Sequence, residues 1–155
     1  MLEVLSAMQC VGLMPPVAIR GAINSLHEYI QQNCENIPEA CPVRHFFAPG
    51  QYCREITIPA GMVVVGRIHK HAHINIITKG KAYVLTPQRG MELIEAPCTF
   101  VSDPITQRLV VPLEDITWST VHVTDCTDPE AVIEEITVKD FNALEILGEY
   151  TEVSE

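Results

Sequence analysis

Two stretches with helical spacing of apolar residues open the chain, and the second is amphipathic. The first covers residues 2–12, and the second runs from Val17 to the neighbourhood of Cys34. Apolar residues of the second recur at the i, i+4, i+7 and i+11 positions of one helix face: Ile19, Ile23, Leu26 and Ile30. Pro16 suits the first turn of a helix, because its missing N–H would have no partner there. This pattern predicts an N-terminal helical extension.

Short β-forming runs follow, separated by turns rich in Gly, Pro and Asp. They cover residues 44–48, 51–58, 62–68, 71–78, 81–86, 91–95, 99–102, 107–113 and 116–124. Many short strands with regular turns are typical of a sandwich or barrel. Asp128, Pro129 and Glu130 then form the start signal of another helix. We therefore expect an all-β barrel over 44–124, a helical extension over 1–43, and an acidic helix and tail over 125–155, in which the segment 141–150 docks on the barrel.

Composition places the chain among globular proteins, with 155 residues, 47% of them hydrophobic and 19% charged. No apolar run approaches the roughly 20 residues that a membrane span needs. The N-terminus lacks the basic region and long apolar core of a secretory signal. We expect a soluble protein with no membrane partner. The six cysteines are scattered without a C-x-x-C pair, which favours reduced, mostly buried thiols.

The negative charge is concentrated at one end of the chain. Residues 1–124 hold ten acids and nine bases, whereas residues 125–155 hold ten acids and one base, Lys139. Nucleic-acid binding depends on neutralising phosphates, so this balance argues against a DNA or RNA partner.

Three of the six histidines lie in the stretch 66–80, spaced two residues apart. On a regular strand, one face would carry His69, His71, His73 and Asn75. Neutral imidazoles can bind a divalent transition metal. A solvated polar face is the alternative, and a one-residue change in strand register would turn the histidines to water.

Other candidate ligands come from neighbouring strands. Glu55 lies on 51–58, while Gln107 and His122 lie on the last strand pair. A cavity holding His69, His73, Glu55 and His122, with His71 as a further candidate, would offer nitrogen and carboxylate ligands that Fe, Mn, Ni or Zn accepts. Trp118, Tyr83, Asn75 and Gln107 are candidates for the lining of a ligand cavity, and for Trp118 ordinary core packing is the alternative.

The layout from Arg44 to Thr124 resembles a cupin, the small jelly-roll barrel of the RmlC type. Counted back from Gly80, His73 stands in place of the family's glutamate, His69 matches a motif histidine, and Arg67 replaces the other. Pro104 matches the turn proline of the second motif, and Gln107 stands where a third histidine would be. The resemblance implies the barrel fold, whereas only His69 of the four usual ligand positions keeps its usual residue, with His73 as a substituted ligand and Gln107 as a weak one.

Five longer runs resemble uncharacterised cupin-like proteins of tailed phages and prophages. They cover residues 45–50, 59–61, 66–70, 96–102 and 114–124. This resemblance implies a viral or prophage origin, and with it the host cytoplasm or a virion as location. It implies no established activity.

Two functions remain open, and the incomplete ligand set favours the first. The first is a phage structural or interaction module that forms a homo-oligomer and contacts other phage structural proteins. The second is a metal-dependent cupin enzyme of the dioxygenase, isomerase or lyase class, or a small-molecule binder, using the histidines. No serine lies in a G-x-S-x-G elbow, so a hydrolase of that kind is not indicated.

Overall fold

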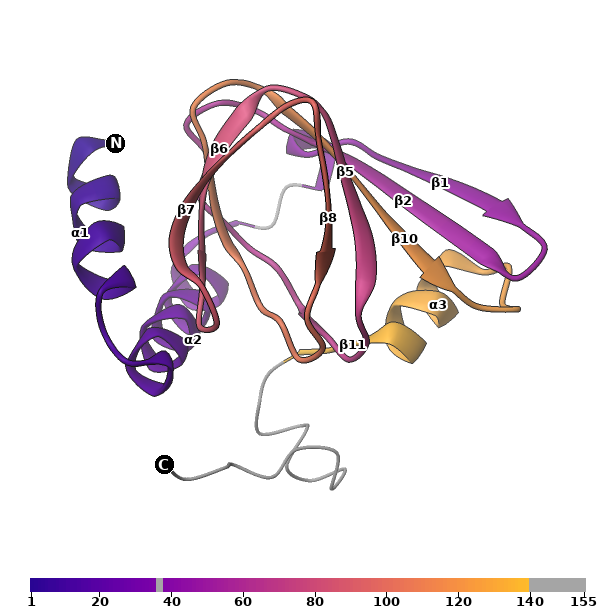
Figure 1. Ribbon diagram of the computed structural model, residues 1–155, viewed down its shortest axis with the longest axis horizontal. Coiled ribbons are helices and arrows are strands. Elements are labelled where there is room, and N and C mark those ends of the chain that lie inside the picture. Colours follow the sequence, from indigo (N-terminus) through magenta and orange to yellow (C-terminus); the bar gives the residue numbers. More distant parts are fainter. Residues whose placement is uncertain (36–37, 140–155) are drawn as a thin grey trace.

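The computed structural model describes residues 1–35 and 38–139, and it consists mainly of antiparallel strands that form a barrel (Figure 1). The helices are α1 (Leu2–Gly12), α2 (Pro16–Asn33), the short 3-10 helix η1 (Pro38–Ala40) and α3 (Pro129–Ile136). The strands are β1 (Val43–Ala48), β2 (Gln51–Ile58), β3 (Val64–Val65), β4 (Ile68–His69), β5 (His73–Lys79), β6 (Lys81–Thr86), β7 (Gly90–Glu95), β8 (Cys98–Ser102), β9 (Leu109–Pro112), β10 (Ile116–Val123) and β11 (Thr137–Val138).

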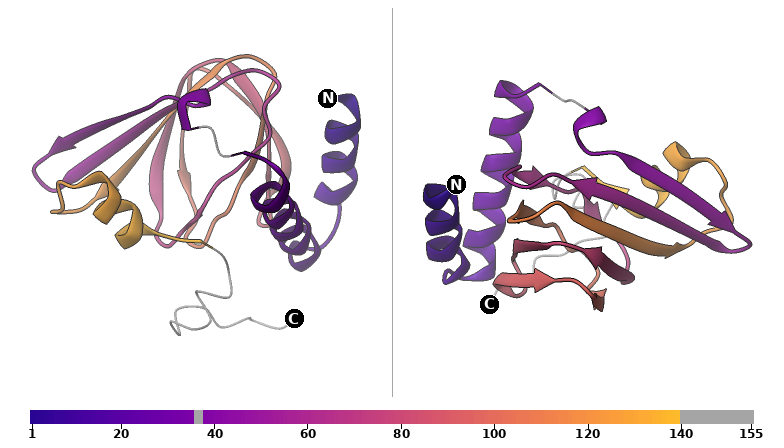
Figure 2. Two further views of the ribbon diagram at one scale, coloured as in Figure 1. Left: turned by 180° about the vertical axis from the view of Figure 1, so that it is seen from behind. Right: turned by 90° about the horizontal axis from the view of Figure 1, so that it is seen from above.

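Two sheets face each other to make the barrel. The larger has the order β1-β2-β10-β5-β8, the smaller has the order β3-β9-β6-β7, and β11 pairs with β4. Figure 2 shows α1 and α2 together beside the barrel and α3 at its other end. The expected all-β jelly-roll barrel, with a helical N-terminal extension and a short C-terminal helix, is confirmed. No helix among the described residues has the length and apolarity required to cross a membrane.

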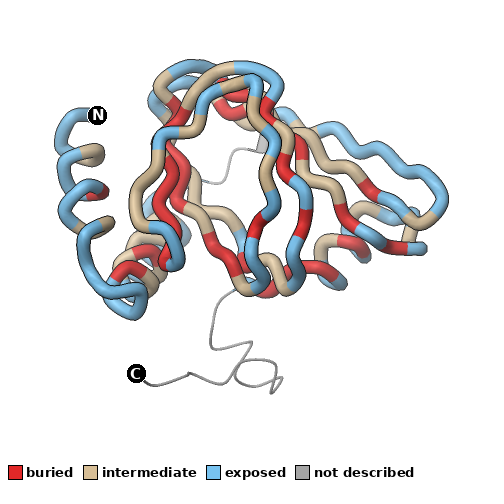
Figure 3. Tube along the Cα trace, viewed as in Figure 1, coloured by how far each residue is buried: buried red, intermediate tan, exposed pale blue. Residues whose placement is uncertain are grey.

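The main core fills the space between the two sheets. Its buried members are Ile58, Ile77, Ala82, Val84, Val110, Ile116 and Trp118. Because side chains alternate along a strand, these residues mark the inner faces of β2, β10, β5, β6 and β9. Figure 3 shows the resulting rows of buried positions along both sheets.

A second core lies outside the small sheet, under the N-terminal helices. Met8 of α1 and Ile19 and Ile23 of α2 are buried against Leu85 and Leu109 on the outer face of β6 and β9. The apolar stripe predicted for α2 is therefore the face that packs on the sheet. This core explains why the extension remains attached to the barrel.

Helix α3 closes the end of the barrel at which β2 and β10 project. The side chain of Asp128 accepts a hydrogen bond of 2.9 Å from the backbone N–H of Ala131, which confirms the predicted N-cap. Val132 and Ile136 pack with the buried ring of Tyr52. The predicted docking segment 141–150 lies outside the described residues.

The strand expected over 71–78, and with it the regular histidine strand, needs a correction. Ile68–His69 forms the separate strand β4, and β5 begins only at His73. The chain changes partners within these few residues, since β4 pairs with β11 while β5 pairs with β10 and β8. A bend therefore replaces the regular alternation, and His71 lies in that bend, exposed.

The glycine at position 80 is required by the backbone. Its φ is +80°, a left-handed conformation, and a Cβ there would overlap the carbonyl oxygen of Asp115.

The cysteines are all free, as expected, but none is fully buried: Cys10 and Cys34 are exposed and the other four are half-buried.

Candidate metal centre

Three histidines from three strands meet at one end of the barrel interior. His69 comes from β4, His73 from β5 and His122 from β10, and one ring nitrogen of each lies within 4.8 Å of the others. Their ring centroids are 4.3 Å apart for His69 and His73, 4.6 Å for His73 and His122, and 5.3 Å for His69 and His122. We call these three residues the histidine cluster.

Strand alternation places two of the three inside the barrel. On β5, His73 and Asn75 are 4% and 0% exposed, whereas Ile74 between them is 45% exposed. The histidines therefore face the interior and not water, which answers the register question. On β10, Trp118 and His122 share the inner face, as their spacing predicts.

His69 reaches the cluster by a different route. Its backbone N–H donates to the carbonyl oxygen of Thr106 at 3.1 Å, and its strand pairs with β11 through Thr137. The sequence predicts a shared face for His69 and His73 on one strand. The structure brings them together through the bend between two strands.

Hydrogen bonding leaves two buried ring nitrogens of the cluster without a partner among the described residues. His73 Nδ1 lies 3.1 Å from the carbonyl oxygen of His71, so Nδ1 carries the proton. The other nitrogen, Nε2, is then an acceptor, and it is buried without a partner among the described residues. His69 Nδ1 is also buried without a partner there. Unpartnered buried nitrogens are costly unless an ion or water binds them.

The cluster holds its imidazoles in the neutral form. Burial lowers the pKa of His122 to about 4, with further lowering by His73 and Arg54. Burial also lowers the pKa of His69 well below its ordinary value, and the nearby His73 and His122 add to this effect. The pKa of His73 is lowered by burial as well. Neutral imidazole is the form that binds metal. The lowered pKa values therefore keep the three imidazoles in that form below neutral pH.

Gln107 has a buried side-chain oxygen. Its side chain is fully buried, and its Nε2 donates to the carbonyl oxygen of Gly66 at 3.1 Å. The side-chain oxygen Oε1 has no partner among the described residues. The neighbouring residue Thr106 forms a β-bridge with His69. Gln107 therefore has a neutral oxygen that is free to accept a hydrogen bond.

Two predicted ligands lie outside the cluster. Glu55 sits on the outer face of β2, where its carboxylate pairs with Arg44 and accepts a 3.4 Å hydrogen bond from Ser119. Alternation explains this placement, because Tyr52 and Ile58 on the same strand face inward. The exposed His71 contributes its carbonyl oxygen, not its ring.

The other predicted cavity residues divide between core and surface. Trp118 is buried, and its Nε1 donates to Asn75 Oδ1 at 2.9 Å, while Asn75 Nδ2 donates to Ser102 Oγ at 2.6 Å. Trp118 thus packs in the core and orients Asn75. Tyr83 faces away from the interior and packs with the N-terminal helices.

Tyr52 and Arg54 are interior residues that were not predicted. The Tyr52 ring lies 6.3 Å from that of His122, and its hydroxyl is 2.7 Å from His45 Nδ1. The Arg54 charge contributes to the lowered pKa values of His69 and His122. Their spacing with Ile56 and Ile58 is a sequence signal that would have placed both on the inner face.

Some solved structures with a similar fold are named as cupins. Ectoine synthase from P. lautus aligns with 73% of this chain and 85% of its own, at 14% identity and a TM-score of 0.53. An RmlC-like cupin from Shewanella frigidimarina aligns with 58% of this chain and 82% of its own, at 17% identity and a TM-score of 0.47. A cupin superfamily protein from Desulfitobacterium hafniense aligns with 59% of this chain and 84% of its own, at 8% identity and a TM-score of 0.47. The similarity to ectoine synthase shows a shared fold and nothing finer.

Comparison at the sequence level adds no family. No family model matches the chain, and no curated protein matches it. The similar structures do not connect the chain with phage or prophage proteins. The viral origin implied by the sequence resemblance therefore stays a prediction.

Proposed function

We propose that this protein is a metal-dependent cupin enzyme in which His69, His73 and His122 bind one divalent transition-metal ion. The observation that carries the proposal is the pair of buried, unpartnered ring nitrogens, His69 Nδ1 and His73 Nε2, in a cluster with His122. Three strands converge to place these nitrogens. A purely structural polar group would be expected to satisfy them with protein partners.

The donor set suits a catalytic ion better than a structural one. Structural zinc sites are usually closed by four protein ligands and often include Cys, whereas catalytic sites keep a position open for water or substrate. Here the cluster supplies three imidazoles and no thiolate. Imidazole suits Zn, Fe, Ni and Cu, while Mn prefers more oxygen ligands. Nitrogen ligands of a tetrahedral ion lie about 3.3 Å apart, so the rings must turn toward a bound ion.

The residues around the cluster have separate roles in this proposal. A bound metal would supply Lewis-acid or redox chemistry to a ligand in the barrel. The His71 carbonyl keeps the proton on His73 Nδ1 and thereby presents Nε2. The free oxygen of Gln107 can accept a hydrogen bond from a water or a substrate hydroxyl.

Metal-dependent stabilisation tests this proposal. Chelator-treated protein should gain about 2.7 kcal/mol at a metal concentration 100 times the Kd, which raises the Tm by roughly 5–10 °C in a chain of this size. Titration with Zn²⁺, Ni²⁺ and Co²⁺, followed by thermal unfolding, measures the effect. The double variant His69→Ala/His73→Ala should lose it.

His71→Ala is the matched control, because it removes a neighbouring imidazole that is exposed and lies outside the cluster. It should keep the full Tm increase. An equal loss in the control, or an unchanged increase in the double variant, would contradict the assignment. Activity assays then follow on a metal-loaded protein that is shown to use this site.

A second candidate is an assembly module that associates with a second copy of itself. One observation favours it: Ile74 and Val101 are register partners on the outer face of the large sheet, and they are 45% and 58% exposed. Light scattering of the wild type would show a dimer or larger species. Ile74→Glu with Val101→Glu should then reduce the mass to that of one chain. A monomeric wild type would remove this candidate.

A further inference from the structure

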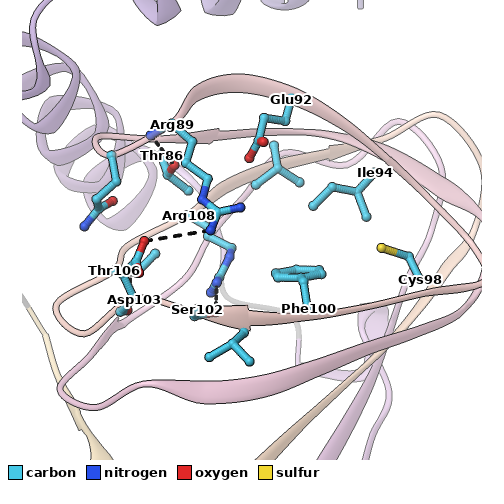
Figure 4. Close-up of a pocket in the computed structure, with 13 residues that line it drawn as sticks. Thr86, Arg89, Glu92, Ile94, Cys98, Phe100, Ser102, Asp103, Thr106 and Arg108 are labelled. Carbon is cyan, nitrogen blue, oxygen red and sulfur yellow. Dashed lines mark hydrogen bonds and ion pairs between the residues drawn. The ribbon is translucent and has the colours of Figure 1, made fainter.

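A cavity of about 170 Å³ opens into the barrel, and Figure 4 shows the residues that line it. One part of its wall is apolar and includes Ile94 of β7 and Phe100 of β8. The other part is polar and includes Ser102, Thr106 and Arg108. A dry cavity of about 150 Å³ accepts benzene, so this one suits a ligand of roughly six to eight non-hydrogen atoms.

The cavity adjoins the histidine cluster through direct strand pairing. Ser102 of its wall is the register partner of His73, and Thr106 of its wall forms a β-bridge with His69. Cβ atoms of directly opposed residues lie about 4.5–5.5 Å apart. The polar part of the cavity is therefore the part that borders the proposed metal site.

Arg108 brings a positive charge into this polar part without a carboxylate partner. Its guanidinium donates to Ser102 Oγ and lies over two aromatic rings, 5.9 Å from the Phe100 centroid and 5.6 Å from the Trp118 centroid. No carboxylate among the described residues forms an ion pair with it. Burial lowers its pKa to about 10, so it stays charged at neutral pH.

The nearby acids do not neutralise Arg108 directly. Asp103 lies 3.9 Å from the guanidinium of Arg89, and both of these side chains are at least half exposed at the rim. Glu92 also lines the cavity, and both acids act on Arg108 from a distance by raising its pKa. A guanidinium presents five N–H donors in a fork that matches a carboxylate. The donors left on Arg108 make it the expected anion contact.

We infer that this cavity binds a small organic carboxylate, with its carboxylate on Arg108 and its apolar body against Ile94 and Phe100. The inference names the substrate class of the proposed metal site and rests on that proposal for the reaction. The binding step itself requires no metal. In this arrangement the carboxylate end of the ligand is the end nearest the histidine cluster.

Fluorescence of Trp118, the chain's one tryptophan, gives a direct readout. A carboxylate that pairs with Arg108 changes the charge over the indole ring and should change its emission. The probes are 3-methylbutanoate, benzoate and 2-oxobutanoate, each titrated to 10 mM into chelator-treated protein. The neutral amides of the same acids are the control ligands. At least one acid should bind saturably, at least tenfold tighter than its amide.

Substitutions at Arg108 and at the rim residue Arg89 test which arginine binds the carboxylate. Arg108→Met should weaken binding of that acid at least tenfold by calorimetry, whereas Arg89→Met should change it less than threefold. Arg108→Lys keeps a charge but loses the fork, and we expect intermediate affinity. Unfolding curves establish that each variant is folded. If no acid binds, if acid and amide bind equally, or if folded Arg108→Met binds as the wild type does, the inference is wrong.

The same measurement on His69→Ala/His73→Ala distinguishes the two proposals. Carboxylate binding should persist in this variant without metal. If metal fails to bind the wild type but the acid still binds on Arg108, only the metal-dependent function is overturned. If metal binds through the cluster and no acid binds, only the carboxylate site is overturned.

Discussion

The inner face of the large sheet has two ends that are built by the same strands and differ in chemistry. At one end β2, β5 and β10 present Ile58, Ile77 and Trp118, which pack against the small sheet. At the other end the same strands present Tyr52, His73 and His122. The strands thus alternate toward one interior throughout, but only one end is filled by apolar side chains.

The arrangement of the layers explains this difference. The small sheet covers the apolar end, whereas β1, β2 and β10 project beyond it at the other end (Figure 1). There, the short helix α3 and the β4–β11 pair provide the cover. Buried polar groups at this end leave lone pairs unsatisfied, which costs stability. The apolar end therefore maintains the fold, while the other end carries the residues that we propose bind the metal.

The largest expected effect is at the apolar end. Ile77→Ala removes a side chain that is 1% exposed in the main core, and it should lower the free energy of unfolding by about 2–5 kcal/mol. Denaturant titration measures this loss. His73→Ala, at the other end of the same strand, should cost clearly less, because it also removes an unsatisfied buried nitrogen. Equal losses of unfolding free energy in the two variants would mean that the two ends contribute equally to stability.

Acidification should destabilise the metal-free protein through the histidine end. The ordinary pKa of a histidine is 6.5, and that of folded His122 is about 4. Between these values the unfolded chain binds protons that the folded chain excludes, so the free energy of unfolding falls as pH decreases. His122 alone should account for a loss on the order of 2–3 kcal/mol from pH 7 to pH 4.

His122→Gln isolates this contribution, because glutamine does not titrate. Unfolding curves of the wild type and the variant at several pH values should therefore converge as pH falls from 6.5 to 4. Parallel pH profiles would show that His122 has an ordinary pKa in the folded protein.

The side-chain amide of Asn75 connects the two ends, and its loss should lower the free energy of unfolding. Asn75 accepts from Trp118 at the apolar end and donates to Ser102 beside the cavity. Asn75→Leu leaves the buried indole N–H without its acceptor, and we expect a loss of about 1–3 kcal/mol. Urea unfolding followed by Trp118 fluorescence measures it. The variant Trp118→Phe with Asn75→Leu, which removes both partners, should recover part of this loss.

The smallest expected effect concerns the cover of the histidine end. Asp128→Ala removes the N-cap of α3 and should cost about 1 kcal/mol. Amide hydrogen exchange should locate the increased opening in α3 and β11 and leave the barrel core unchanged. Uniform loss of protection across the barrel would show that α3 does not open on its own.

Sequence periodicity was sufficient for the parts of the molecule where regular strands alternate. It predicted that His73 and Asn75 share one face and that Trp118 and His122 share another, because those strands are regular, but it left open whether the histidine face points inward. It failed for His69, since the change of sheet at the bend depends on pairing with β11, far along the chain. Long-range pairing of this kind leaves no local pattern.

The two remaining differences have separate causes. Glu55 is predicted as a ligand from its residue type, although the alternation of side chains along β2 places it on the outer face of the sheet. Arg108 lies in a run, 107–113, that is apolar on both faces, so alternation could not show which way it points. Its placement over Phe100 and Trp118 became visible only in three dimensions.

X-ray absorption spectroscopy of the metal-loaded protein tests the central claim most directly. The six free cysteines offer a competing set of ligands, and sulfur and nitrogen differ in distance to zinc, about 2.3 Å against about 2.0–2.1 Å. We predict three imidazole nitrogens at the shorter distance and no sulfur, with the imidazole signal lost in His69→Ala/His73→Ala. Sulfur in the first shell, or fewer than two imidazoles, would contradict it.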